Sequence, residues 1–557
     1  MGSIIPLKLK LYYDETNRVF ILILKKMKKL VIWIFLIIAL IVIGIIVFAL
    51  YSTHDRNPGY TLNLKIPLIS EKPGQLQVGF ATQKITPDLP DRWTDVDNNA
   101  KYEPEKGDTF IDGNKNGRFD AFWLAGFDNK RAANGIHDDI WARAIIWDDS
   151  ATVVGMVVLD AIGIFNDDVT TVREMVAQRI PEIDHVIISA THCHEVPDLM
   201  GNYGESQYSS GVNREYLRMV QGKAADAICE AYRNRHPAVL EYAQIDSVEK
   251  DLVDDGRMPI VYDDGIRMMK VTDKANGQMM GLLVNYGNHP ETAGSKNLLI
   301  TSDILHYLRD GIERGIYYDN DEKRHGTGGT VIFMNGAVGG IMSGMWVATY
   351  DPWLNKTFRT DDNSFDKVRA QGYRLADKIL DKLEKEQWKV IDNPSVSLYA
   401  KSFQFKMQNK LFKLAAIMGV FDRGFIGFKY VRSEVDLLTI GPAWFITIPG
   451  EVNPEIINGG IETPEGRDFE ISAVELPPVR ELMRGEINFV IGLANDEVGY
   501  IMPKSHWDKK APYTYNEKEA PYGEINSLGP ETGPELHNQI KMIIDDLLTS
   551  SRQAKKK

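Results

Sequence analysis

The chain has 557 residues, of which 44% are hydrophobic and 25% charged, and its formal net charge at pH 7 is −13. This composition is that of a folded protein with a sizeable core, and excludes a disordered or fibrous chain. The acidic balance and the lack of a long basic stripe argue against nucleic acid as a partner, and two cysteines, Cys193 and Cys229, are too few to staple a fold of this size.

The amino-terminal region contains an uninterrupted apolar run, residues 30–51, long enough to cross about 30 Å of hydrocarbon as one transmembrane helix. Four lysines precede it at positions 25, 26, 28 and 29. The positive-inside rule therefore predicts a cytoplasmic tail, 1–29, and an extracytoplasmic (periplasmic or extracellular) remainder. No cleavage site of small residues is obvious, so we expect an uncleaved signal-anchor. Met27 is an alternative start, which leaves 1–26 either a genuine tail or an over-extended reading frame.

The rest of the chain divides into a polar, proline-containing linker at 52–74, one folded region at 75–551 and a basic tail at 552–557. In the folded region, strands are expected at 77–84, in a pair that turns at 148–150 and ends at Asp160, and at 185–189, with helices at 169–180 and 214–234. A strand ending at His289, a helix at 302–314, a strand into a glycine-rich turn and a helix at 365–386 follow. Strands at 397–405, 436–440 and 444–448 and a helix from about 537 complete the chain. This alternation indicates an α/β fold with mixed sheets and flanking helices.

A polar loop before residue 122 has the oxygen spacing of a calcium-binding loop. In DGNKNGRFD the oxygen-bearing side chains are Asp112, Asn114, Asn116 and Asp120. Position twelve is Trp123, where such loops place a bidentate glutamate. The alternatives are therefore a calcium site and a solvated Asx/Gly turn.

The stretch 186–198, VIISATHCHEVPD, predicts a buried strand that delivers two imidazoles to its end. Residues i and i+2 point to the same side of a strand, so His192 and His194 can share a pocket, one as a metal ligand and the other facing substrate. On this pattern alone, both can equally be satisfied core or loop histidines. Three other apolar runs end in turns with a metal-capable side chain, at His289, Glu451 and Tyr500.

The order of these motifs resembles a known family. GFATQKITPD, GIHDDIWARA, ISATHCH, VNYGNHPE with ITSDI, IFMNGAVGG, IPGE and LANDEVGY are similar to the amino-terminal catalytic domain of the neutral/alkaline, non-lysosomal ceramidases, over about residues 78–551. The resemblance implies a membrane-anchored, bacterial-type member with the ceramidase catalytic-domain fold. It also implies a zinc-dependent amidohydrolase of sphingolipid metabolism, which cleaves N-acylsphingosine (ceramide) to sphingosine and a fatty acid.

The resemblance also assigns roles to residues. The zinc ligands fall on His192, His289, Glu451 and Tyr500, and the residues that act on the amide fall on His194, Arg257, Tyr500 and Tyr522. Arg257 and Tyr522 lie beside insertions or deletions relative to the family. We expect zinc-bound water to attack the amide, with Tyr500 and His194 stabilising the oxyanion and helping to protonate the amine.

One departure from the family affects the mechanism. Where the family has a serine in a GDVSP turn, this chain reads GAVGG with Gly339, so an acyl-enzyme at that position is excluded. Asp160 and Asp303 either orient a ligand histidine or cap an element. The apolar stretch 411–428 is core, a wall of a lipid channel, or a membrane contact.

Two further functions remain open at this point. One is an amidase for another N-acyl substrate, such as an N-acyl amino acid or an envelope lipid. The other is an anchored lipid- or glycan-binding protein with altered catalysis. Convergence of the four ligands on one point, at about 2.0–2.2 Å from each, favours the enzyme. The sequence indicates no oligomeric state.

Overall fold

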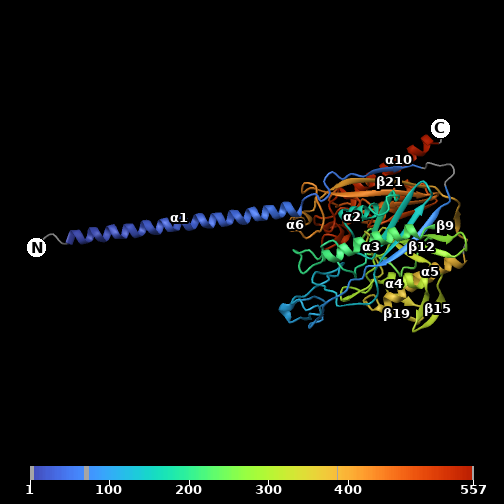
Figure 1. Ribbon diagram of the computed structural model, residues 1–557, viewed down its shortest axis with the longest axis horizontal. Coiled ribbons are helices and arrows are strands. Elements are labelled where there is room, and N and C mark those ends of the chain that lie inside the picture. The colour runs from blue at the N-terminus through green and yellow to red at the C-terminus, as the bar shows by residue number, and fades with distance from the viewer. Residues whose placement is uncertain (1–4, 68–73, 386, 555–557) are drawn as a thin grey trace.

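The computed structural model describes residues 5–67, 74–385 and 387–554, and shows a long helix projecting from a layered α/β body (Figure 1). This helix, α1 (Ile5–Ser52), includes the apolar run and the lysine cluster. Its segment Asn17–Ser52 is long and apolar enough to cross a membrane, and its most apolar window is not buried against the body.

The larger sheet has nine strands, in the order β16-β12-β11-β9-β2-β6-β7-β8, with β20 paired to β9. The bounds are β2 (Gln77–Lys84), β6 (Trp141–Asp148), β7 (Val153–Leu159), β8 (His185–Ala190), β9 (His236–Ile245), β11 (Ile266–Asp273), β12 (Met279–Tyr286), β16 (Thr330–Asn335) and β20 (Lys389–Ile391). The β7–β8 and β12–β16 pairs are parallel and the other neighbours antiparallel. Both faces of β6 and β7 are buried, which explains why their sequences are almost continuously apolar.

The smaller sheet has five strands, in the order β1-β21-β22-β23-β25. The bounds are β1 (Asn63–Ile66), β21 (Val396–Lys406), β22 (Tyr430–Ile440), β23 (Ala443–Thr447) and β25 (Ile487–Ile491). One apolar cluster joins the two sheets face to face, with Ile145 and Met156 from the larger sheet and Leu438 and Phe445 from the smaller.

Helices cover the outer faces of both sheets and complete an α/β/β/α arrangement (Figure 1). The helices on the larger sheet are α2 (Asn166–Ala177), α3 (Arg214–Arg233), α4 (Ile304–Glu313) and α5 (Phe365–Lys385), and α10 (Thr532–Ala554) packs on the smaller. The predicted mixed α/β class is therefore confirmed. The last helix begins at Thr532, five residues before the predicted start.

Shorter elements occupy the loops. They are β3 (Arg92–Thr94), β4 (Thr109–Ile111), β5 (Gly135–Ile136), β10 (Asp254–Asp255), β13 (Leu299–Ile300), β14 (Gly315–Tyr318), β15 (Asp321–His325), β17 (Met342–Ser343), β18 (Thr349–Asp351), β19 (Lys356–Phe358), β24 (Glu451–Val452), β26 (Tyr500–Ile501), α6 (Lys410–Ile417), α7 (Pro454–Asn458), α8 (Val479–Leu482) and α9 (Tyr522–Ile525).

The predicted linker is largely part of the fold. Strand β1 pairs antiparallel with β21, and Leu64 and Ile66 pack against the cluster between the sheets. The alternation of Asn63, Leu64, Lys65 and Ile66 is the period-two pattern of a strand with one buried face. Of the predicted linker, residues 68–73 lie outside the described residues.

Candidate metal centre and pocket

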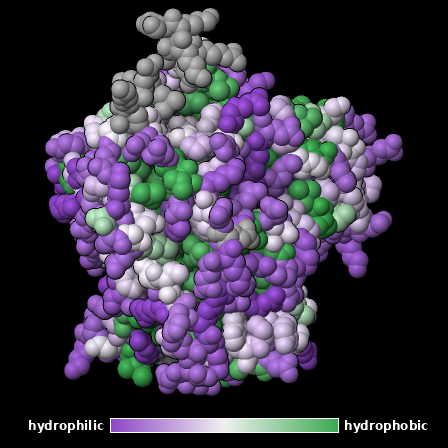
Figure 2. Space-filling view, turned by 90° about the vertical axis from the view of Figure 1, so that its right-hand side faces the viewer, coloured by the Kyte–Doolittle hydropathy of each residue, from purple (hydrophilic) through white to green (hydrophobic). Residues whose placement is uncertain are grey.

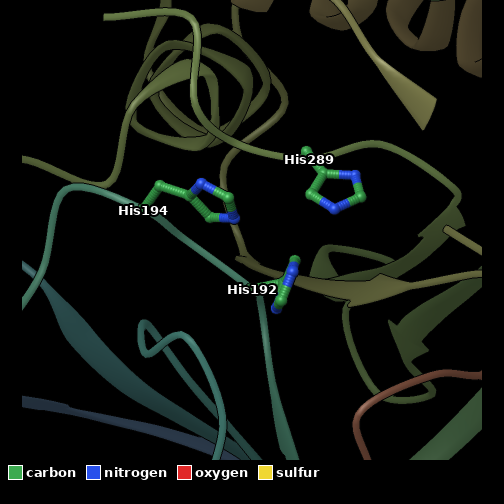
Figure 3. Close-up of side chains that lie close together, drawn as sticks. All are labelled: His192, His194 and His289. Carbon is green, nitrogen blue, oxygen red and sulfur yellow. The ribbon is translucent and has the colours of Figure 1, made fainter. Parts of the chain in front are cut away.

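His192 follows β8 and His289 follows β12, so both lie beyond the carboxyl ends of strands of the larger sheet. Their rings face one another there (Figure 3). The Nδ1 atom of His192 lies 2.7 Å from the carbonyl oxygen of Ile162, and that of His289 lies 2.8 Å from the carbonyl oxygen of Met342. A carbonyl only accepts, so each Nδ1 carries a proton, and Nε2 is the nitrogen that can bind a metal once its own proton is released. His192 also has a φ of +65°, a strained conformation for a non-glycine residue at the end of β8.

The carboxylate of Glu451 lies between these two nitrogens. Its Oε2 atom is 3.3 Å from Nε2 of His192 and 3.3 Å from Nε2 of His289. Ligands held tetrahedrally at 2.0–2.2 Å from zinc lie about 3.3–3.6 Å apart, so these separations fit a zinc site. Burial acts to raise the pKa of Glu451, but the charges and hydrogen bonds of the two histidines outweigh it and hold that pKa below its usual range. The carboxylate is therefore ionised, as a ligand must be.

Tyr500 is placed beside Glu451 by backbone pairing. Strands β24 and β26 are parallel, with Glu451 opposite Tyr500. Burial, together with the charge and hydrogen bond of Glu451, raises the pKa of Tyr500 well above its usual value. The hydroxyl is thus a proton donor at neutral pH in the structure described.

His194 is the third imidazole of the cluster. One ring nitrogen from each of His192, His194 and His289 lies within 4.8 Å of the other two. The Nδ1 atom of His194 lies at the ion-pair distance of 2.9 Å from Oε2 of Glu291, but the contact is not aligned as a hydrogen bond. Its Nε2 is buried and has no hydrogen-bond partner among the described residues. Burial lowers the pKa of His194 to about 4. Burial alone would raise the pKa of Glu291, but the neighbouring charge of His194 outweighs it and lowers that pKa to about 2. We assign a neutral imidazole oriented by an ionised carboxylate.

Sequence reasoning missed Glu291, although a signal was present. Glu291 follows His289 at the spacing i, i+2, the spacing that relates His194 to His192. The segment NHPE thus repeats the spacing of THCH, with a glutamate in place of the second histidine.

Asn335, at the end of β16, joins the two histidine segments. Its Nδ2 donates to the carbonyl oxygens of Thr191 and Asn288, each at 2.9 Å, and these residues directly precede His192 and His289. The side chain is fully buried. Asn335 is thus a positioning residue that was not predicted.

Asp160 and Asp303 do not contact the ligand histidines through any hydrogen bond of the described residues. Asp160 accepts both guanidinium hydrogen bonds of Arg309, at 2.9 Å each. Asp303 caps α4 and accepts from the backbone of Thr292 and Ala293, at 3.1 and 2.8 Å. Both residues therefore fix neighbouring segments of the chain and do not orient a ligand histidine directly.

Gly339 lies directly against the strand that carries Glu451. A Cβ atom built on Gly339 would lie 2.5 Å from the carbonyl oxygen of Glu451 and 2.6 Å from the backbone nitrogen of Asn453. No side chain fits there without moving that strand. This explains in physical terms why the turn has glycine instead of serine.

Arg257 and Tyr522 occupy different positions relative to the cluster. Tyr522 lines the main pocket and makes an edge-to-face contact with Tyr500, with ring centroids 5.7 Å apart. Arg257 is buried against Glu524, with Nη2 2.8 Å from Oε1, and lines a separate cavity of about 160 Å³. The structure thus brings Tyr522 to the main pocket, whereas Arg257 lines only the smaller cavity, which Tyr522 also borders.

The predicted calcium residues form a hydrogen-bonded turn. The Nδ2 atoms of Asn114 and Asn116 donate to Oδ2 of Asp120, at 2.7 and 2.5 Å, and Gly117 donates to Asp112 at 2.7 Å. The amide nitrogens face the carboxylate, so calcium binding requires both amides to rotate. Calcium stays a prediction.

A second group has the spacing of metal ligands: His185, Glu434 and Asp436. The guanidinium of Arg173 already supplies the positive charge beside it. Both carboxylate oxygens of Glu434 accept from Arg173, at 2.8 and 2.6 Å. This group is a buried ion network of the core.

A pocket of about 630 Å³ leads from the surface to the histidine cluster. His192, His194, Glu451 and Tyr500 line it. Its walls are mainly apolar, and the stretch 411–428 supplies many of them: Leu411, Phe412, Leu414, Ala415, Met418, Val420, Phe421, Arg423 and Phe425. Of the three interpretations of that stretch, a pocket wall is observed.

No protein-family model and no curated protein matches the sequence. Solved structures do match. The crystal structure of neutral ceramidase from Pseudomonas aeruginosa aligns with a TM-score of 0.59 and 16% identity, over 87% of this chain and 75% of that chain. This chain has the neutral ceramidase fold. A second structure, described as a ceramidase complexed with C2, aligns with a TM-score of 0.59 and 15% identity, over 86% and 76% of the two chains. The ceramidase fold predicted from the order of the motifs is thereby confirmed.

Proposed function

We propose that this protein is a zinc-dependent amidohydrolase that cleaves the amide bond of an N-acyl lipid, with ceramide as its substrate and sphingosine and a fatty acid as its products. One observation carries the proposal. In a ceramidase fold, two histidine Nε2 atoms converge on a carboxylate oxygen, at 3.3 Å each, beside a mainly apolar pocket.

The donor set favours zinc over other cations. Two imidazoles, one carboxylate and a neighbouring tyrosine are nitrogen and oxygen donors of the kind found in catalytic zinc sites with an open position. His192, His289 and Glu451 would hold the ion, with Tyr500 as a further ligand. Zinc, when bound, polarises the amide carbonyl and lowers the pKa of a coordinated water toward about 7.

His194 and Tyr500 supply the proton transfers and the oxyanion contact. Hydrolysis adds the hydroxyl of one water to the acyl carbon and one proton to the amine nitrogen, while the C–N bond breaks. The unpartnered Nε2 of His194 can accept the proton of the water and return it to the leaving nitrogen. The protonated hydroxyl of Tyr500 can donate to the developing oxyanion. With Gly339 at the turn, this route needs no acyl-enzyme.

The pocket supports a lipid substrate because its walls are largely aliphatic and aromatic. A few polar side chains, Asn129, Asn202 and Gln207, also line it and can bind hydroxyl or amide groups of a headgroup. This combination fits an N-acylated amino alcohol with long chains.

We also propose that α1 is an uncleaved anchor and that the catalytic region lies on the extracytoplasmic side. The lysines before the apolar run support this orientation. Protease added outside right-side-out vesicles should degrade the catalytic region, whereas protection of that region would reverse the topology.

The test combines metal analysis with product release. The full chain, purified in detergent, should bind one zinc per chain and release fatty acid from ceramide within a panel that also contains N-acyl amino acids and other N-acyl lipids. His192→Ala should lose zinc and activity, whereas His325→Ala, an exposed histidine outside the site, should keep both. Full activity in metal-stripped protein would refute the mechanism. Zinc binding without hydrolysis of any panel member would instead indicate a binding protein.

A further inference from the structure

The segment that follows α1 is fixed to the catalytic domain by ion pairs. Arg432 donates to both carboxylate oxygens of Asp55, at 2.9 and 2.8 Å. Arg56 donates to the buried Asp422, with Nη2 2.5 Å from Oδ1. The carbonyl oxygen of His54 accepts from the backbone of Phe425 at 3.1 Å. The end of the helix therefore has a defined orientation relative to the pocket.

Helix α6 packs against the end of α1, as Figure 1 shows at the base of the long helix. A Cβ atom built on Gly419, just after α6, would lie 3.0 Å from Oγ of Ser52 and 3.4 Å from Cζ of Phe48. Phe48 belongs to the apolar run, and at 1.5 Å per residue it lies about 5 Å before the end of that run. The end of α6 is therefore at the depth where the apolar part of the helix meets water.

The outward side of α6 is apolar and the residues around it are basic. Leu411, Leu414 and Ile417 are 60%, 49% and 36% exposed. Lys410 and Lys429 are exposed nearby, on a chain whose net charge is −13. Apolar side chains flanked by lysines are typical of a helix that lies in a lipid interface.

The same helix forms part of the pocket mouth. Residues that line the pocket and are also exposed mark its rim. They are one polar residue, Gln207, and five mainly apolar ones, Tyr208, Leu411, Leu414, Tyr522 and Ile525. The face on the side away from α1 is different, because it is mostly hydrophilic with separate, small hydrophobic groups (Figure 2). The apolar rim therefore adjoins the helix that enters the membrane.

We propose that α6 lies on the lipid leaflet nearest the catalytic domain, in the membrane that α1 spans, and holds the pocket mouth against it. A lipid then passes from that leaflet into the pocket without crossing water. The identity of the lipid rests on the proposed function, but the contact of α6 with the leaflet rests on the geometry of α1 and α6 alone.

The contact is tested with a fluorescent probe on the full chain in proteoliposomes. Both native cysteines are buried, so a thiol-reactive fluorophore reports an introduced cysteine. We compare Leu414→Cys with Val390→Cys, an apolar residue on β20 that is 61% exposed. Lipid-borne nitroxide should quench the probe at 414 about threefold more than at 390, and aqueous iodide should show the reverse order. Equal quenching at the two positions overturns the proposal.

Delivery from the leaflet is tested by activity on two forms of ceramide. Ile417→Glu should slow hydrolysis in vesicles about tenfold and change hydrolysis in detergent micelles less than about twofold, because a charge opposes seating in the interface. Val390→Glu should change neither. An equal loss in both forms overturns the delivery route. If the unmodified protein hydrolyses ceramide in neither form, the proposed function fails, and the quenching result still decides whether α6 contacts the leaflet.

Discussion

The Cβ position of Gly339 lies 2.5 Å from the carbonyl oxygen of Glu451, closer than any side chain can approach a backbone atom without displacing it. The turn after β16 and the strand that carries the candidate carboxylate ligand are therefore packed backbone to backbone. A serine at this turn therefore has a structural cost, because its side chain would displace the backbone of Glu451.

Gly339→Ser should lower zinc occupancy and activity together, because the added atoms displace Glu451. Elemental analysis and fatty-acid release measure the two effects. Gly222→Ala is the matched control, since nothing lies within 4 Å of a Cβ there, and it should be neutral. An active Gly339→Ser enzyme that accumulates an acyl-serine would contradict this account.

Asn335→Leu should weaken metal binding by about 10- to 100-fold, the range seen when groups that position ligands are lost. The carbonyl oxygens of Thr191 and Asn288 would lose their donor, at a cost of about 1–3 kcal/mol in folding free energy. Competition with a chelator and denaturant unfolding measure the two quantities. Asn538→Ala, on the exposed side of α10, should change neither. Unchanged zinc affinity in Asn335→Leu would show that the loops hold their positions without it.

His194→Ala should keep zinc and lower kcat by about 10²- to 10⁴-fold, the range for loss of a general acid or base. Glu291→Gln should also keep zinc and show a smaller loss, because an amide oxygen still faces Nδ1 but without charge. Single-turnover kinetics with zinc analysis separates the roles. Loss of zinc in His194→Ala would make that residue a ligand, not a proton carrier.

Asp168 should make folding stability depend on pH. Burial raises its pKa to about 8, against a usual 3.8, and one oxygen has no hydrogen-bond partner among the described residues. The folded state binds the proton more tightly, so its stabilisation is full below about pH 4 and is lost as pH rises through 8. Asp168→Asn should therefore gain stability relative to the unmodified protein as pH rises from 4 to 8, by a few kcal/mol in total.

Denaturant unfolding in detergent, followed by tryptophan fluorescence, tests this at several pH values. Asp88→Asn, at an exposed aspartate, is the control and should show a constant difference. A constant difference for Asp168→Asn as well would mean that Asp168 is not protonated in the folded protein.

The sequence predicted those features whose signals are local. Each of His192, His289, Glu451 and Tyr500 follows an apolar run, and the structure brings the four together at the sheet edge. Glu291 and Asn335 were missed because their roles depend on contacts between distant segments, such as Asn335 with Thr191, 144 positions away. Strand β1 was assigned to a linker for the same reason, because its partner β21 lies more than 300 residues later.

The ion pairs from Asp55 and Arg56 to the α/β body leave that body little freedom to turn about α1, the proposed anchor. A domain held in this way meets its substrate by lateral diffusion in the plane of the membrane. Its turnover should follow the mole fraction of substrate within its own membrane, so that adding inert phospholipid slows it even when the total amounts of enzyme and ceramide are constant. Lipid in neighbouring vesicles should remain untouched until it transfers or the membranes fuse.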